Sequence, residues 1–275
     1  MPELPEVEVS RLGLLPHLVG QPIRQAVFRA PKLRHELPLA LAGRLAGLRI
    51  DAIVRRGKYL LFDCQSRTGG GWLILHLGMS GSLRLVAPGT PAQKHDHVDL
   101  AFTETVLRFR DPRRFGTLVW HESERIDDHP LIARLGIEPL SPSFDGHWLY
   151  AATRHRTAPI KPMLMDSHVI VGIGNIYAAE SLFMAGISPR RAAGTLTRPQ
   201  CERLCAAIRA TLERSIAAGG SSVRDYVHSD GGAGSFQLTC AVYDQAGKPC
   251  PTCHHPIRVF RQGGRSSFYC AHCQQ

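Results

Sequence analysis

Residues 250–273 read CPTCHHPIRVFRQGGRSSFYCAHC and contain four of the eight cysteines of the chain. The spacing is Cys-x2-Cys-x16-Cys-x2-Cys, in which two tight turns each supply two thiolates to a tetrahedral zinc site. The insert between the turns is long enough to fold as a hairpin. The sequence therefore predicts a zinc ribbon that binds one structural Zn2+. Because four sulfurs complete the tetrahedron, the nearby His254, His255 and His272 are not expected to be ligands. The predicted ligands are Cys250, Cys253, Cys270 and Cys273.

The composition is that of a basic, globular protein of about two domains by length. The 275 residues include 33 Lys and Arg against 23 Asp and Glu, for a formal net charge of +10. Without an apolar stretch long enough to span a membrane, this surplus favours a polyanionic partner, most simply nucleic acid. A merely basic enzyme is the alternative interpretation. The acidic start lacks the segments of a secretory signal, so we expect a cytoplasmic protein.

Short β-rich segments separated by Gly and Pro fill most of the chain from residue 22 to about residue 121. No helical pattern alternates with them, which favours an antiparallel sandwich or barrel. Before them, residues 5–19 predict one helix. The predicted strands are residues 22–28, 47–55, 58–64, 72–77, 82–86, 97–102 and 106–109.

From about residue 130 to residue 229 the pattern becomes helical. Thr197 and Gln200 form a capping-box pattern, and Cys201 and Cys205 follow at helical spacing among apolar residues. Two cysteines one turn apart on that face are interpreted as core residues. The glycine-rich residues 172–175 precede a second predicted helix, and such a helix start can bind phosphate.

These patterns predict an α+β multidomain fold. It consists of an N-terminal antiparallel β-sandwich with an N-terminal helix, a helical domain and a C-terminal zinc-ribbon hairpin. The expected domains are residues 1–130, 131–239 and 240–275.

The N-terminus carries a chemical signal of its own. Removal of Met1, which is normal before a small residue, leaves Pro2 as a free secondary amine with Glu3 beside it. Such an amine can attack an aldehyde-like carbon and form a Schiff base, and a neighbouring carboxyl group can move protons. On chemistry alone, an ordinary chain start remains the alternative.

Blocks of sequence along the whole chain resemble the bacterial formamidopyrimidine-DNA glycosylase family. The first block is MPELPEVE at residues 1–8, and the last is the zinc motif. The blocks between them are RGKYLL (56–61), HLGMSGSLR (76–84), KHDHV (94–98), DPRRFG (111–116), IKP (160–162) and GIGNIYA (172–178).

The resemblance implies a bifunctional DNA glycosylase and abasic-site lyase of base excision repair, acting on 8-oxoguanine and formamidopyrimidines. Pro2 would attack C1′ of the damaged nucleoside, and Glu3 would protonate the opening sugar. Lys58 would assist β-elimination and Arg265 δ-elimination. The helical domain would contain a helix–two-turn–helix motif that binds DNA.

The resemblance also implies that the damaged nucleotide is flipped out, and assigns Met79, Arg113 and Phe115 to the hole it leaves. Apolar side chains can wedge between bases, and an arginine can hydrogen-bond the orphaned base. The glycine-rich turn at Met79 and the two arginines before Phe115 do not suit core residues. Further DNA contacts are implied for His95, Arg156, Lys161 and Asn175.

Some alternatives remain open at the level of sequence. His95 and His97 could form a metal pair on a strand, but no third ligand follows at a useful spacing. Arg224 stands where the family often has lysine, in a segment that, with residues 229–235, would help cover the extruded base. Arginine keeps the positive charge of lysine but changes the shape of the pocket, on which the preference among oxidised purines depends.

The implied partner is double-stranded DNA containing oxidised purines or abasic sites, with zinc as the cofactor and no membrane partner. We expect a monomer in the bacterial cytoplasm, associated with the nucleoid when bound to DNA. The nearest rival is the endonuclease VIII family, which prefers oxidised pyrimidines, but Leu4 and Met79 favour the purine enzyme. A non-catalytic DNA-binding zinc protein is a second rival, disfavoured by the presence of Pro2 and Glu3.

Overall fold

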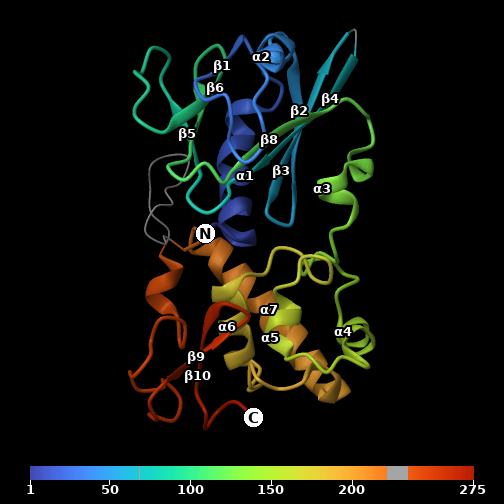
Figure 1. Ribbon diagram of the computed structural model, residues 1–275, viewed down its shortest axis with the longest axis vertical. Coiled ribbons are helices and arrows are strands. Elements are labelled where there is room, and N and C mark those ends of the chain that lie inside the picture. Colours follow the sequence, from blue (N-terminus) through green and yellow to red (C-terminus); the bar gives the residue numbers. More distant parts are fainter. Residues whose placement is uncertain (68, 222–234) are drawn as a thin grey trace. The chain divides into compact units, whose positions relative to one another are not determined.

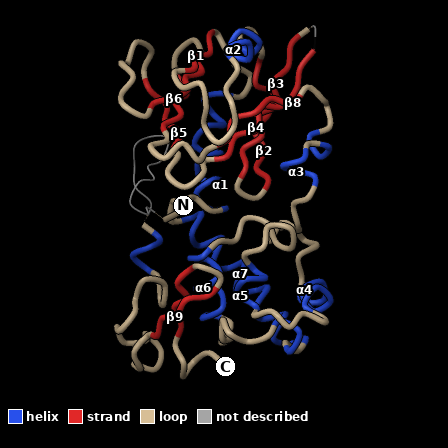
Figure 2. Tube along the Cα trace, viewed as in Figure 1, coloured by secondary structure: helices blue, strands red, loops and turns tan. Residues whose placement is uncertain are grey.

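A computed structural model describes residues 1–67, 69–221 and 235–275, and its internal contacts divide the chain into two units. The first unit comprises Met1–Ala133 and Ala218–Ser235, and the second comprises Arg134–Ala217 and Phe236–Gln275. Strands dominate the first unit and helices the second (Figure 2). Arg224 and residues 229–234 lie outside the described residues. No helix in the described ranges combines the length and apolar character needed to cross a membrane.

Two antiparallel sheets of four strands each form the first unit (Figure 1). Their strand orders are β1-β6-β7-β5 and β2-β3-β4-β8. Apolar side chains of α1 and of both sheets meet in one buried core, which makes this unit the predicted sandwich. The strands are β1 (Gln25–Phe28), β2 (Arg49–Arg56), β3 (Tyr59–Ser66), β4 (Gly69–His76), β5 (Ser82–Val86), β6 (Asp96–Ala101), β7 (Val106–Arg110) and β8 (Thr117–His121). The helices are α1 (Leu4–Leu18), α2 (Leu39–Leu45), η1 (Ile126–Asp128) and α3 (Pro130–Ala133).

The register of the β2–β3 hairpin places Lys58, which is half-buried, in the turn between the two strands. Arg56 pairs with Tyr59, so Gly57 and Lys58 form a two-residue turn. Gly57 has a φ of 57°, which is the left-handed conformation that such turns require. Lys58 is thereby placed at the end of the hairpin.

Helices α6 and α7 pack together in the second unit, and a short hairpin, β9–β10, follows them. Cys201 and Cys205 of α7 are buried, which confirms that they are core residues. The predicted capping box is present, since Thr197 N–H donates to the Gln200 side chain at 3.0 Å. The elements are α4 (Gly146–Thr153), α5 (Ile160–Leu164), α6 (Asn175–Met184), η2 (Ala193–Thr195), α7 (Arg198–Ala217), η3 (Phe236–Thr239), β9 (Arg258–Gln262) and β10 (Arg265–Tyr269).

Glu180 of α6 attaches the zinc module to the helices. Its buried carboxylate accepts hydrogen bonds from the N–H groups of Ala241, Val242 and Tyr243 at 2.8, 2.9 and 2.8 Å. A carboxylate that accepts several backbone hydrogen bonds makes a strong local anchor. The structure therefore groups residues 236–275 with the helices, while the division at residues 130 and 239 stays a prediction.

Candidate functional site

Pro2 and Glu3 lie at the start of α1, and both are buried. Glu3 is the N-cap residue of the helix and is only 3% exposed. Pro5 in the first turn favours a helix start here, because a proline at that position loses no helical hydrogen bond. Glu3 directly follows Pro2 in the chain, and its carboxyl group lies at the positive end of the helix dipole.

Glu6, in the first turn of α1, fixes the backbone around Glu3. One of its carboxylate oxygens accepts from Glu3 N–H at 2.7 Å, as in a capping box. The other accepts from the N–H and the hydroxyl of Ser221 at 2.7 and 2.9 Å. At Gly220, whose φ is +78°, a Cβ would meet this oxygen at 3.2 Å. Glu6 therefore joins the helix start to residues 220–221.

We expect Glu6→Gln to lower the free energy of unfolding by about 2 kcal/mol, because an amide nitrogen would face a buried N–H donor. Urea unfolding monitored by tryptophan fluorescence measures the change. The matched control is Glu124→Gln, an exposed side chain in the same unit, whose effect should stay within about 0.5 kcal/mol. Equal stability of the two variants would show that the Glu6 hydrogen bonds contribute nothing.

Lys58 lies close enough to His76 to affect its ionisation. Burial, assisted by the charges of Lys58 and Arg34, lowers the pKa of His76 to about 4. The ring is therefore neutral at pH 7, and its Nδ1 accepts from Gly78 N–H at 2.9 Å. This contact ties the end of β4 to the turn that carries Met79.

Met79 and Phe115 are large apolar side chains that remain exposed, at 41% and 46%. Their two turns touch: a Cβ on Gly78 would come within 2.5 Å of the Phe115 carbonyl carbon, so only glycine fits there. The Arg113 guanidinium lies 4.9 Å from the centre of the Phe115 ring. Exposure of this kind is what a wedge needs, and the contact of these three residues with DNA stays a prediction.

Asp111 links the turn that carries Met79 to the turn that carries Phe115. Its fully buried carboxylate accepts from the Ser80 hydroxyl at 2.8 Å and from Gly116 N–H at 2.7 Å. The carbonyl of Asp111 contacts His97 Nε2 at 2.9 Å. A buried acceptor with several donors restricts both loops, so the exposed side chains are presented on a rigid base.

His97 is hydrogen-bonded inside the protein, two residues after His95 in the chain. Burial lowers the pKa of His97, whose Nε2 is engaged by Asp111. Neither histidine belongs to any group of three potential ligands among the described residues. His95 is half-buried and has a φ of 77°. Its contact with DNA stays a prediction.

Arg265 is exposed at the start of β10, in the second unit. Gly263 and Gly264 precede it with φ values of 56° and 74°, so they form the left-handed turn between β9 and β10. The backbone next to Arg265 is anchored, because the carbonyl of Ser266 accepts hydrogen bonds from Lys161 Nζ at 3.2 Å and from Asn175 Nδ2 at 3.0 Å.

Lys161 is buried and hydrogen-bonded within the second unit, and its contact with DNA stays a prediction. It is 2% exposed, and its ammonium also donates to Asn175 Oδ1 at 2.7 Å and to Ser267 Oγ at 2.8 Å. The three acceptors satisfy the three donors of an ammonium. Lys161 and the Asn175 side chain therefore support the Arg265 hairpin from inside the protein.

We expect Lys161→Met to destabilise the second unit by about 3 kcal/mol, because three buried acceptors lose a charged donor. Thermal unfolding of the zinc-loaded chain measures the effect. Lys248→Met, at an exposed lysine of the same unit, is the control and should leave the transition unchanged. A Lys161→Met chain as stable as this control would contradict the supporting role.

Arg156 is exposed, and its Nε donates to the carbonyl of Ala152 at 2.9 Å. Helix α6 begins at Asn175, directly after the glycine-rich residues 172–174, as its pattern predicts. DNA contacts by Arg156 and by this helix start stay predictions.

The four C-terminal cysteines converge on one point. The Sγ atoms of Cys250 and Cys273 are 3.9 Å apart, those of Cys253 and Cys270 are 3.3 Å apart, and all four lie within 4.8 Å of one another. A tetrahedral zinc ion with Zn–S bonds of about 2.3 Å needs sulfurs about 3.8 Å apart. Burial opposes ionisation of Cys250, but hydrogen bonds from backbone N–H groups lower its pKa to about 7. The site fits one structural zinc ion.

Three domain families match successive parts of the chain. Residues 1–118 match the formamidopyrimidine-DNA glycosylase N-terminal domain, residues 135–227 the formamidopyrimidine-DNA glycosylase H2TH domain, and residues 247–275 the zinc finger found in FPG and IleRS. The formamidopyrimidine-DNA glycosylase of Dechloromonas aromatica is 59% identical, over 100% of both chains. The chain belongs to the formamidopyrimidine-DNA glycosylase family.

Solved structures of formamidopyrimidine-DNA glycosylases share this fold. The MutM (FPG) protein of Thermus thermophilus is 40% identical, with a TM-score of 0.86 over 99% of this chain and 98% of that one. A Lactococcus lactis Fpg mutant in complex with Fapy-dG-containing DNA is 34% identical, with a TM-score of 0.91 over 100% of both chains. Wild-type Lactococcus lactis Fpg in complex with DNA containing an oxidised pyrimidine is 33% identical, with a TM-score of 0.90 over the same coverage. The predicted fold class and the resemblance are confirmed.

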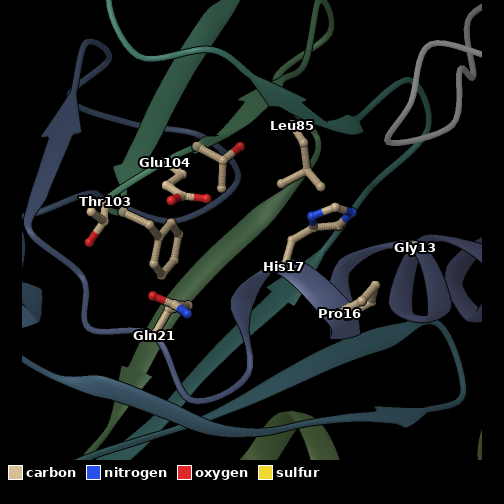
Figure 3. A pocket seen from close by; sticks show the side chains of 9 residues that line it. Gly13, Pro16, His17, Gln21, Leu85, Thr103 and Glu104 are labelled. Atoms are coloured by element: carbon tan, nitrogen blue, oxygen red, sulfur yellow. The ribbon is translucent and has the colours of Figure 1, made fainter.

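The first unit of this formamidopyrimidine-DNA glycosylase also has a hollow of about 790 Å³ away from its predicted catalytic residues. His17, Glu104 and Leu85 face it (Figure 3). It lies at the C-terminal end of α1, whereas Pro2 and Glu3 precede the N-terminal end, about 20 Å away along a helix of this length. This hollow is therefore separate from the predicted catalytic residues.

Four supporting residues of this family member escape sequence reasoning: Glu6, His76, Asp111 and Glu180. Glu6, His76 and Asp111 stand inside blocks that carry the family resemblance, but nothing in the blocks shows which donors they bind. For Glu6 the spacing to Glu3 is a usable signal, since it is that of a capping box. Glu180 has no local signal at all, because its partners lie 61 to 63 residues later.

Proposed function

We propose that this chain is a bifunctional DNA glycosylase and abasic-site lyase that removes oxidised purines from duplex DNA. The observation that carries the proposal is the full-length match to named formamidopyrimidine-DNA glycosylases. The buried Pro2–Glu3 pair at the start of α1 supports it, because a nucleophile and a proton donor stand next to each other.

Catalysis starts at the Pro2 nitrogen once Met1 has been removed. The amine attacks C1′ of the damaged nucleoside, the N–C1′ bond forms, and the glycosidic bond breaks as the base leaves. Glu3 protonates the sugar ring oxygen as the ring opens, which leaves an iminium between Pro2 and C1′.

Strand cleavage follows from the iminium. It acidifies the C2′ proton, whose removal expels the 3′ phosphate by β-elimination, and a second elimination releases the 5′ phosphate. Lys58 assists the first elimination and Arg265 the second. Water then hydrolyses the iminium, which releases the sugar remnant as an aldehyde and restores the free amine of Pro2.

The exposed turns at Met79 and at Arg113–Phe115 would fill the space of the flipped nucleotide. A flipped base leaves its neighbours unstacked and its partner unpaired, and these losses have to be compensated. Met79 and Phe115 supply apolar surface, and Arg113 supplies donors for the orphaned base. The buried Asp111 that joins the two turns supports this reading, since a wedge must resist the closing stack.

The proposed partner is double-stranded DNA with oxidised purines or abasic sites, bound by a monomer. We expect the enzyme to work in the bacterial cytoplasm and to associate with the nucleoid through DNA. A second substrate class is supported by the Lactococcus lactis Fpg complex with DNA containing an oxidised pyrimidine. Activity on pyrimidine lesions would therefore not by itself move the chain to the endonuclease VIII family.

Single-turnover excision on matched duplexes tests the substrate class. The duplexes carry 8-oxoguanine, a formamidopyrimidine, an oxidised pyrimidine or undamaged guanine at one position. We expect the two purine lesions to be excised at least tenfold faster than the pyrimidine lesion, with no cleavage of guanine. A preference for the pyrimidine lesion would overturn the proposed substrate, and no excision of any lesion would leave a DNA-binding protein.

A further inference from the structure

Beside the zinc centre lies a second group of metal-binding side chains that shares one of its sulfurs. We propose that His255, His272 and the Cys253 thiolate bind a second divalent transition-metal ion, with Cys253 bridging it to the structural zinc. One ligand atom of each of these three residues lies within 4.8 Å of the other two. This site is independent of the proposed function.

The two cysteine turns bring the histidines together. His255 follows the first Cys-x2-Cys turn, and the left-handed His254, with a φ of 63°, reverses the chain just before it. His272 lies inside the second turn. The two imidazole rings stack across the site, with centroids 4.7 Å apart and an angle of 7° between their planes. The two turns thus each bring one imidazole ring to within 4.8 Å of the Cys253 sulfur, measured between ligand atoms.

The orientation of His255 suits a metal ligand. Its Nδ1 is 3.2 Å from the carbonyl oxygen of Cys253. Histidines that bind metals usually donate one ring N–H to a carbonyl or carboxylate, which fixes the ring and leaves the other nitrogen for the ion. Here the carbonyl belongs to the cysteine whose sulfur completes the group.

The distances are compatible with a metal after a small movement. Bonds of about 2.0 Å to nitrogen and 2.3 Å to sulfur place tetrahedral ligands roughly 3.3–3.6 Å apart. A spacing of 4.8 Å, the upper limit here, would therefore have to close by roughly 1.2–1.5 Å. Both histidines are exposed, so rotation of their side chains can supply this movement without disturbing the core.

Charge favours a second cation at this position. Four thiolates around one Zn2+ leave a net charge of −2, and a second divalent ion bridged by Cys253 would neutralise it. The histidines also line a hollow of about 200 Å³ that gives an ion access. Arg258 lines the same hollow and opposes a cation, so the second ion should bind more weakly than the first. Imidazole and thiolate donors suit Zn2+ and Co2+.

The test is a Co2+ titration of the full chain, free of any histidine tag and loaded with one zinc, at pH 7.5. Native mass spectrometry counts the metals, and visible absorption reports sulfur bound to cobalt. The variant is His255→Ala with His272→Ala. The control is His254→Gly, which removes the neighbouring imidazole and accepts the left-handed φ.

We expect the wild-type chain and the control to form a species with one zinc and one cobalt that has a sulfur-to-cobalt absorption band. The double variant should keep its zinc and bind this cobalt at least tenfold more weakly, without the band. Zinc content shows that the variant has kept its ribbon fold. Equal cobalt binding by the double variant would overturn the proposal. So would replacement of zinc by cobalt without any species that holds both metals.

Discussion

Glu3→Gln is expected to slow base excision by about 10²–10⁴-fold, because the change removes a positioned proton donor and little else. Glu3 is buried beside Pro2, and glutamine has nearly the same shape. Cleavage at a preformed abasic site should be reduced by less than about tenfold, since there the aldehyde already exists and the Pro2 amine is intact. Single-turnover assays on the two substrates measure this difference.

Glu8→Gln provides the matched control for Glu3. Glu8 lies further along the same helix and pairs with Arg11 and Arg55. Burial raises the pKa of Glu8, but the two arginines lower it by more, so that the pKa is lowered overall. We expect its loss to affect stability slightly and to leave both reactions unchanged. Equal losses of excision and abasic-site cleavage in Glu3→Gln would contradict the assignment of Glu3 as the acid for base removal.

Loss of the zinc site is expected to have the second large effect. Cys250→Ala removes one of four ligands, and structural zinc contributes about 10 kcal/mol or more to the folding of a small zinc module. The β9–β10 hairpin should lose its order and misplace Arg265. We therefore expect zinc to be lost and duplex affinity to fall by about 100-fold, through lost phosphate contacts.

Metal analysis and fluorescence anisotropy on a lesion-containing duplex measure the two losses. Cys201→Ala is the control, because this cysteine is equally buried but lies in helix α7. It should keep its zinc and its affinity. A Cys250→Ala chain that binds the duplex as tightly as this control would contradict the role given to the zinc module.

Helices and strands that are marked by a local sequence signal have bounds close to the predicted ones. The helix predicted at residues 5–19 is α1 at Leu4–Leu18, and the strand predicted at residues 82–86 is β5 with the same bounds. Proline, capping residues and alternating burial mark these elements within a few positions. Helix α2 is not predicted, because its seven residues include Gly43 and the preceding Pro38 supplies no side-chain cap.

Lys161 shows what a sequence cannot reveal. Lysine is rarely buried, so a lysine in a block associated with DNA binding is naturally assigned to the DNA. Its actual partners are 14, 105 and 106 residues away in the sequence. Only the packing of the hairpin against α5 and α6 brings them together. Glu6 and Ser221 are likewise hydrogen-bonded although they are 215 residues apart in the sequence.

Borohydride trapping on a duplex with 8-oxoguanine opposite cytosine tests the central claim most directly, since borohydride reduces an iminium to a stable amine. Intact mass first confirms that Met1 has been removed, because an acylated Pro2 nitrogen cannot attack. We expect a covalent protein–DNA adduct that maps to Pro2 and is lost or greatly reduced in Pro2→Gly. No adduct with the processed wild-type chain, or an undiminished adduct in the variant, would contradict catalysis by the N-terminal amine.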